Sequence, residues 1–171
     1  IVENEFFTEY QAANIFKQIL NSVSHLHSAG ICHRDLKPEN FMLVSKVDDL
    51  LDVQVKTIDF GLSKICTMSK EGKLERMKTK VGTPYYISPD VLCGDYSLSC
   101  DIWSAGCILY IMLCGYPPFN GDSDDEILKN VQRGDLRFDE EEWSEISKEA
   151  KDLIKKMVVR KEKRITAQEA L

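Results

Sequence analysis

The sequence predicts a mainly α-helical fold that contains one short β-hairpin. Residues 101–114 are apolar on nearly every side, which is typical of a central, buried helix. Residues 41–44 and 53–58 have the composition of two short strands, with a polar turn at Asp48 and Asp49 between them. Upstream of this hairpin, one helix face is indicated by apolar residues at helical spacing, namely Ala12, Ile15, Ile19, Val23 and Leu26.

Capping residues set the expected limits of these helices. Thr8 and Gln11 have the spacing of a capping box, and Gly30 is expected to end the first helix. Three further helices are expected at residues 123–132, at residues 147–158 and from Thr166 to the end of the chain. Between Asp59 and Asp90 no periodicity is evident, and irregular segments of this length are usually functional.

Composition excludes several classes of protein. The 171 residues are 43% hydrophobic and carry a net charge of −6, and no apolar run is long enough to span a membrane. Basic residues do not cluster as they do in proteins that bind nucleic acids. We interpret the cysteines that recur at seven-residue spacing, Cys93, Cys100, Cys107 and Cys114, as small core residues of a cytoplasmic protein. The chain starts without Met or a signal pattern, so we expect its natural N-terminus elsewhere.

Four short motifs follow one another in a fixed order. Residues 33–40 are His-Arg-Asp-Leu-Lys-Pro-Glu-Asn, residues 59–61 are Asp-Phe-Gly, residues 82–86 are Gly-Thr-Pro-Tyr-Tyr and residues 101–106 are Asp-Ile-Trp-Ser-Ala-Gly. Each motif alone is weak, but together they resemble serine/threonine protein kinases over essentially the whole chain. The resemblance implies the C-terminal lobe of the bilobal kinase fold, with ATP and Mg²⁺ as cofactors and a protein or peptide as substrate.

The resemblance assigns a role to five side chains around the phosphate. Asp35 would accept the proton of the substrate hydroxyl, and Lys37 would place a positive charge beside the transferred phosphate. Asn40 and Asp59 would supply the hard oxygen ligands that magnesium prefers. Thr83 would hydrogen-bond toward Asp35 and Lys37. Directly after the metal ligand, the glycine at position 61 is expected to give the backbone its freedom.

Other residues would support this site. His33, Phe60 and Asp101 are implied to connect the catalytic loop to the buried helix, with Asp101 accepting backbone amides of the loop. Met42 and Ile58 match the floor of the adenine site, a role compatible with being ordinary core residues of a strand. His25 and His27 are expected to have no chemical role. Two alternatives stay open for Glu39: contact with a basic residue of the substrate peptide, or a solvated side chain with no partner in the substrate.

A phosphate is expected to regulate the site. Arg34 precedes the proposed base, and Thr79 lies four residues before Thr83, where similar kinases carry an activating phosphothreonine. A phosphate on Thr79 would place nearly two negative charges opposite Arg34. Thr67 and Ser69 are lesser candidates for the same modification.

The chain also departs from the family pattern. Residues 88–90 are Ser-Pro-Asp where Ala-Pro-Glu is usual, so the expected ion pair of Asp90 with Arg164 has one methylene less to span the gap. A Gly-rich loop, a strand Lys, a helix Glu and a hinge are missing. We therefore expect residues 1–171 to be a C-lobe without its N-lobe, truncated in its last helix and inactive alone.

Within the kinases, residues 108–119 and 143–154 resemble the calmodulin-dependent group. Residues 7–9 and 58–63 are most similar to calcium-dependent protein kinases of plants and apicomplexan parasites. That resemblance implies a role in calcium signalling and a calmodulin-like domain after the kinase domain. The alternative is a pseudokinase or scaffold lobe that acts by binding proteins.

Overall fold

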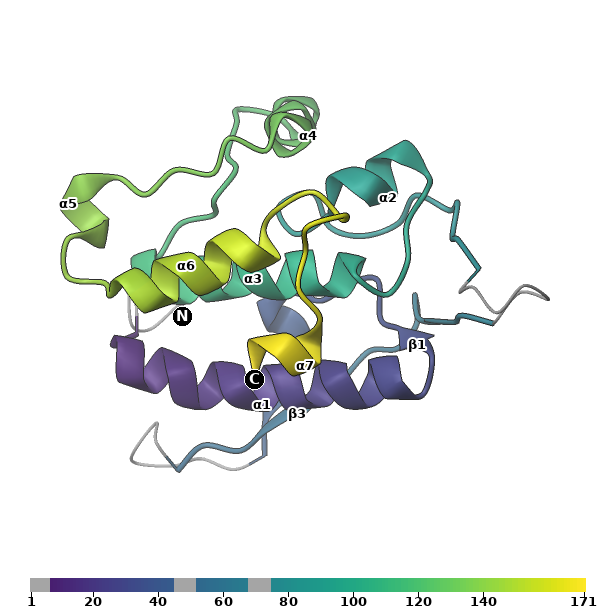
Figure 1. The fold of residues 1–171 in the computed structure, drawn as a ribbon, viewed down its shortest axis with the longest axis horizontal. Coiled ribbons are helices and arrows are strands. Elements are labelled where there is room, and N and C mark those ends of the chain that lie inside the picture. Colours follow the sequence, from purple (N-terminus) through teal and green to yellow (C-terminus); the bar gives the residue numbers. More distant parts are fainter. Residues whose placement is uncertain (1–6, 45–51, 68–74) are drawn as a thin grey trace.

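The helix α3 (Cys100–Cys114) is the centre of the fold in this computed structural model, which describes residues 7–44, 52–67 and 75–171. Every residue of α3 except the last is buried. The long helix α1 (Glu9–Ser28) and the helix α6 (Lys148–Met157) both pack against it, and the three run side by side in Figure 1. The predicted central, buried helix is therefore confirmed.

The cap of α1 forms as its sequence predicts. The Thr8 hydroxyl accepts the N–H of Gln11 at 3.3 Å, and the Gln11 side chain accepts the N–H of Thr8 at 3.1 Å. Gly30 follows the helix with a left-handed φ of 71°, which glycine adopts without strain. Thr166 and Glu169 form a second capping box at α7 (Ala167–Ala170), and α7 packs against α1. The apolar face of α1 thus faces both α3 and α7.

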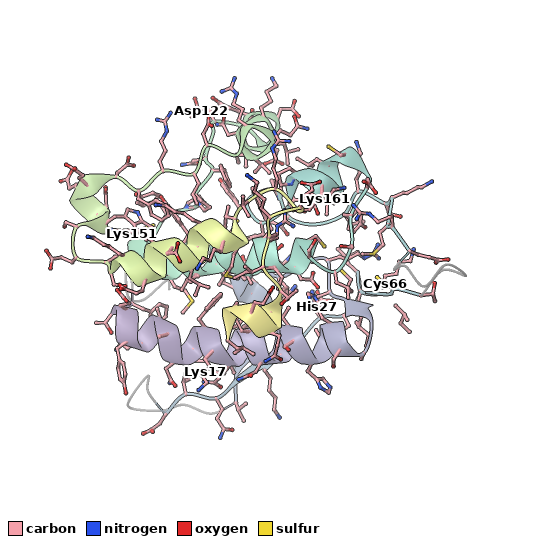
Figure 2. The ribbon with its side chains drawn as sticks, in the orientation of Figure 1. Lys17, His27, Cys66, Asp122, Lys151 and Lys161 are labelled. Carbon is pink, nitrogen blue, oxygen red and sulfur yellow. The ribbon has the colours of Figure 1, made fainter. Side chains whose placement is uncertain are left out.

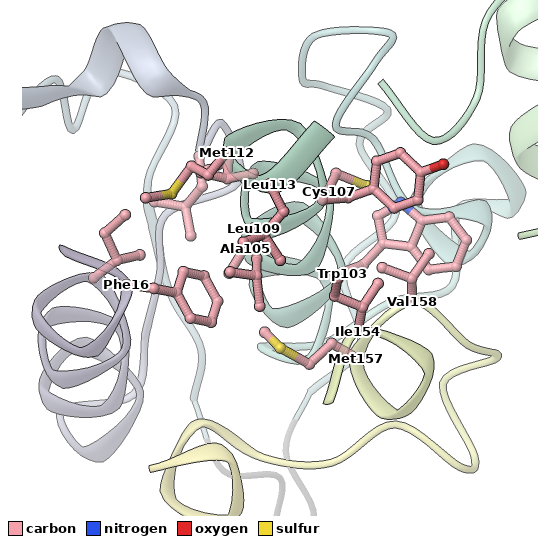
Figure 3. Close-up of a cluster of buried hydrophobic side chains, with 14 of the residues drawn as sticks. Phe16, Trp103, Ala105, Cys107, Leu109, Met112, Leu113, Ile154, Met157 and Val158 are labelled. Atoms are coloured by element: carbon pink, nitrogen blue, oxygen red, sulfur yellow. The ribbon is translucent and has the colours of Figure 1, made fainter. Parts of the chain in front are cut away.

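Contact between α3 and α6 is close because Gly106 has no side chain. A Cβ atom at this position would lie 2.6 Å from Cγ2 of Val158 and 2.9 Å from Cβ of Met157. Figure 3 shows Ile154, Met157 and Val158 beside Trp103, within the largest cluster of buried apolar side chains. The packing of these two helices therefore depends on a glycine.

Two antiparallel strand pairs lie beside the helices. The strand β2 (Phe41–Leu43) pairs with β3 (Val55–Thr57), and Met42 lies opposite Lys56. This is the predicted hairpin, with shorter strands than expected. A second pair, β1 (Ile31–Cys32) with β4 (Lys64–Ile65), has strands too short to show a pattern in the sequence. The predicted turn at residues 48–49 and Ser69 lie outside the described residues.

The other expected helices are present at nearly the predicted places. The predicted helix at residues 123–132 is α4 (Asp124–Arg133), and α6 occupies most of residues 147–158. Two short helices were not predicted, α2 (Pro89–Cys93) and α5 (Glu140–Trp143). Cys93 is exposed at the end of α2, so its assignment to the core was wrong. No helix of the described residues is long and apolar enough to cross a membrane.

Candidate active site

The first residues of α3 anchor the loop that contains the predicted catalytic residues. Asp101 is buried, and its two carboxylate oxygens accept the backbone N–H groups of His33 and Arg34, each at 2.9 Å. Burial raises the pKa of Asp101, but the His27 contact and these two amides outweigh that effect and hold the pKa below its usual range. The predicted role of Asp101 as an acceptor of loop amides is supported by this geometry.

His27 is an unpredicted part of this anchor. Its Nε2 atom lies 3.0 Å from a carboxylate oxygen of Asp101, and Figure 2 labels His27 between α1 and the start of α3. His27 was expected to have no chemical role, and its contact with Asp101 is a structural one that the sequence did not indicate. These two residues are 74 positions apart, so only the packing of α1 on α3 brings them together.

Asp35 forms a compact hydrogen-bonded group with Lys37 and Thr83. The Lys37 ammonium lies 2.8 Å from one oxygen of Asp35, and the Thr83 hydroxyl donates to the other at 2.9 Å. Lys37 also donates to the Thr83 hydroxyl at 3.3 Å. The bond to Asp35 raises the pKa of Lys37 despite burial, and the charges of Asp35, Glu39 and Asp59 act in the same direction. Lys37 is therefore a fixed positive charge among carboxylates.

Asn40 and Asp59 lie at the ends of two paired segments. The Asn40 carbonyl accepts the N–H of Ile58 at 2.8 Å, which places the residue before Asp59 against Asn40. The Asn40 side chain donates through Nδ2 to the Asp35 carbonyl at 2.8 Å, so its amide oxygen is the atom left for a ligand. The Asp59 side chain is exposed. An amide oxygen and a carboxylate fit the oxygen donors that Mg²⁺ requires.

The left-handed residue of the 59–61 motif is Asp59 rather than Gly61. Asp59 has φ 60°, and Gly61 instead donates its N–H to Oδ1 of Asp59 at 3.1 Å. The freedom expected of the glycine is therefore not used for a left-handed angle at position 61. An added Cβ at Gly61 would lie 3.1 Å from the same carboxylate oxygen, so the glycine leaves room for the Asp59 side chain.

His33 connects the two loops. The Asp35 N–H donates to His33 Nδ1 at 3.4 Å, and His33 Nε2 donates to the Ile58 carbonyl at 3.2 Å. Phe60 contacts the same imidazole, with ring centroids 5.2 Å apart. The imidazole therefore contacts the backbone of both loops. His33 is buried and structural in this arrangement, as its position in the motif suggested.

The remaining predicted residues fall into three places. Met42 is exposed on β2 and Ile58 is half-buried after β3, positions compatible with the floor of a nucleotide site. Arg164 forms the expected fork with Asp90, through N–O distances of 2.8 and 3.4 Å between buried groups. The two charged groups thus contact each other despite the shorter Asp side chain, through one short and one long N–O distance. Thr79 is exposed, and its carbonyl accepts a bond from Tyr96.

Comparison with known proteins identifies the family of the chain. The family model described as protein kinase domain matches residues 1–171. Calcium-dependent protein kinase 3 of Plasmodium berghei (strain Anka) is 49% identical over 172 residues, covering 100% of this chain and 30% of that protein. Calcium-dependent protein kinase 4 of Plasmodium falciparum (isolate 3D7) is also 49% identical over 172 residues, covering 100% of this chain and 31% of that protein.

Calcium-dependent protein kinase 5 of P. falciparum is 48% identical over 154 residues, which cover 90% of this chain and 26% of that protein. The chain therefore spans less than a third of the length of these relatives. The resemblance to calcium-dependent protein kinases is confirmed by these identities. With its central helix, its paired loops and a family match that extends from the first residue to the last, this chain belongs to the protein kinase domain family.

Proposed function

We propose that this chain is the substrate-positioning half of a serine/threonine protein kinase. The arrangement of Asp35, Lys37 and Thr83 is the observation that carries the proposal. Asp35 accepts the proton of a serine or threonine hydroxyl of the substrate and directs the oxygen of that hydroxyl at the phosphorus atom. Lys37 stays protonated beside it and stabilises the negative charge of the transferred phosphoryl group.

Asn40 and Asp59 hold Mg²⁺ in this proposal, and Met42 with Ile58 contact the adenine of ATP. ATP would supply the phosphoryl group and leave as ADP, and Mg²⁺ would neutralise part of the phosphate charge. The donor set supports this role because it consists of an amide oxygen and a carboxylate on adjacent segments. The rest of the nucleotide site belongs to an N-lobe outside residues 1–171, so the isolated chain should not transfer phosphate.

An Asp35→Asn variant of the full-length protein tests the proposal. Phosphate transfer from labelled ATP to a serine-containing peptide should fall by about 10²–10⁴-fold, because the amide cannot accept the proton. The melting temperature should change little. Asp135→Asn, a change of the same kind at an exposed residue after α4, is the matched control. Activity of Asp35→Asn equal to that of the control would contradict the assignment.

A pseudokinase or scaffold lobe is the second candidate function. No transfer by the wild-type full-length protein, with Mg²⁺–ATP present, would favour it.

The names of the relatives suggest a further property, since all three are called calcium-dependent. We propose that the full-length cytoplasmic protein acts in calcium signalling, through a calmodulin-like domain. Transfer rates that are equal with Ca²⁺ and with a chelator would contradict that property.

Thr79 is the proposed regulatory site. Its side chain is exposed, and among the described residues no carboxylate lies within ion-pair distance of the Arg34 guanidinium. A phosphate on Thr79 would supply the missing negative charge. Thr79→Ala should therefore abolish the rise in activity that follows phosphorylation. A Thr79→Ala variant as active as the phosphorylated wild type would refute this role.

A further inference from the structure

The segment around Thr79 is attached to the loop that follows α2. Met77 and Tyr96 form an isolated antiparallel bridge, with N–O distances of 2.9 and 3.2 Å, and both side chains are buried. Next to this bridge, the Asp95 carboxylate binds Arg76 at 2.8 Å and Lys161 at 2.6 Å. Figure 2 labels Lys161 close to α2. Residues 76–79 are therefore held by backbone bonds and by one acidic residue.

The Tyr96 hydroxyl extends this attachment to the catalytic loop. It donates to the backbone carbonyl of Thr79 at 2.7 Å and accepts a bond from Nη1 of Arg34 at 3.3 Å. The ring is completely buried, so water cannot easily replace either bond. One hydroxyl thus joins the residue before Asp35 to the proposed regulatory residue.

Arg34 needs such a partner. Its φ is 71°, a left-handed conformation that is strained for a residue with a side chain and persists only where its surroundings hold it. Besides Tyr96, the guanidinium donates through Nε to the Leu62 carbonyl at 2.5 Å. Within the described part of the chain, both acceptors that the guanidinium contacts are uncharged. The Arg34 side chain is therefore held by neutral acceptors before any phosphate is present, while the Asp101 carboxylate holds its backbone N–H.

We propose that Tyr96 is a positioning residue that holds Arg34, and through it Asp35, in the absence of phosphate on Thr79. The inference rests on the proposed kinase function and adds to it. Because Tyr96 binds the backbone carbonyl of Thr79, its effect does not depend on the side chain at position 79. A phosphate on Thr79 would add charge to an existing contact between the two segments.

Tyr96→Phe in the dephosphorylated full-length protein tests the inference. The change keeps the ring and removes only the hydroxyl, so kcat should fall by about tenfold while KM for ATP stays within about twofold. The same loss is expected in a Thr79→Ala background. Tyr10→Phe, which alters an exposed tyrosine on α1, is the matched control. An unchanged kcat in Tyr96→Phe would overturn the inference.

A second measurement separates this inference from the kinase assignment. Amide hydrogen exchange of residues 33–36 and 76–79 requires no activity, and it should accelerate in Tyr96→Phe but not in Tyr10→Phe. The combination with Arg34→Met should then cost less activity than the two single changes predict, because both remove the same contact. Strict additivity, or unchanged exchange, would overturn the role of Tyr96. Inactivity of the wild type would instead refute the proposed function and leave the exchange result to decide about Tyr96.

Discussion

Replacing Arg164 with Met should lower the free energy of unfolding by about 3–5 kcal/mol, the usual cost of removing one partner from a buried ion pair. The side chains of Arg164 and Asp90 are 0% and 4% exposed, so water cannot compensate the carboxylate that remains. Methionine nearly preserves the volume of the side chain. The loss is therefore mainly electrostatic rather than the result of a new cavity.

Other contacts of Arg164 support the upper part of this range. Its guanidinium donates to the Ser99 carbonyl at 2.9 Å and to the Val159 carbonyl at 3.0 Å, and lies 5.3 Å from the Trp103 ring centroid. Each buried carbonyl left without a donor costs about 1–3 kcal/mol unless the structure relaxes. Arg164 thus joins α2, the start of α3 and the segment after α6.

Thermal and urea unfolding of the full-length protein measure the effect. For a domain of this size, each kcal/mol lowers the melting temperature of the corresponding transition by about 2–4 °C. Adding Asp90→Asn to Arg164→Met should recover part of the loss, because it removes the unpaired charge. Arg133→Met, at an exposed residue of α4, is the control. A loss below about 1 kcal/mol, or a double variant as unstable as the sum of the two single ones, would refute the reasoning.

Two further predictions concern α3. In Gly106→Ala, overpacking against Val158 should cost about 1–3 kcal/mol, and the better helix propensity of alanine should offset about 1 kcal/mol of this cost. A variant more stable than the wild type in urea unfolding would contradict the close approach of the two helices. Asp101 has a lowered pKa, so its contribution to stability is present above the ordinary carboxyl pKa of about 4 and is lost as the pH falls through the lower folded value. The free energy of unfolding, measured with urea, should therefore fall more steeply below roughly pH 4 in the wild type than in Asp101→Asn. Parallel plots of this free energy against pH for the two proteins would count against the linkage.

Much of the fold and part of the site could be predicted because their signals are local. The periodicity of α1, the apolar composition of α3 and the capping boxes at Thr8 and Thr166 depend on residues within a few positions of one another. The contacts of Asp35 with Thr83 and of Asp90 with Arg164 join residues far apart in the chain. They were expected only from the resemblance to kinases.

The unpredicted contacts have no such signal. His27 reaches Asp101 across 74 positions, and Tyr96 reaches Arg34 across 62. Neither His27 nor Tyr96 is distinguished by its sequence neighbours, because the tertiary packing of distant segments selects the partner. The left-handed angle at Asp59 was also not predicted, because such angles are uncommon in residues that carry a side chain.

The two left-handed residues with side chains in the described segments, Arg34 and Asp59, both adjoin the proposed chemistry. Such conformations cost about 1–3 kcal/mol each, so each loop must be held by its surroundings. Asp101 holds the first loop through two amides, and His33 joins it to the Ile58 carbonyl of the second. The two loops therefore form one mechanical unit fixed to the start of α3, and a change that shifts this end of the helix should disturb the proton acceptor and the metal ligands together.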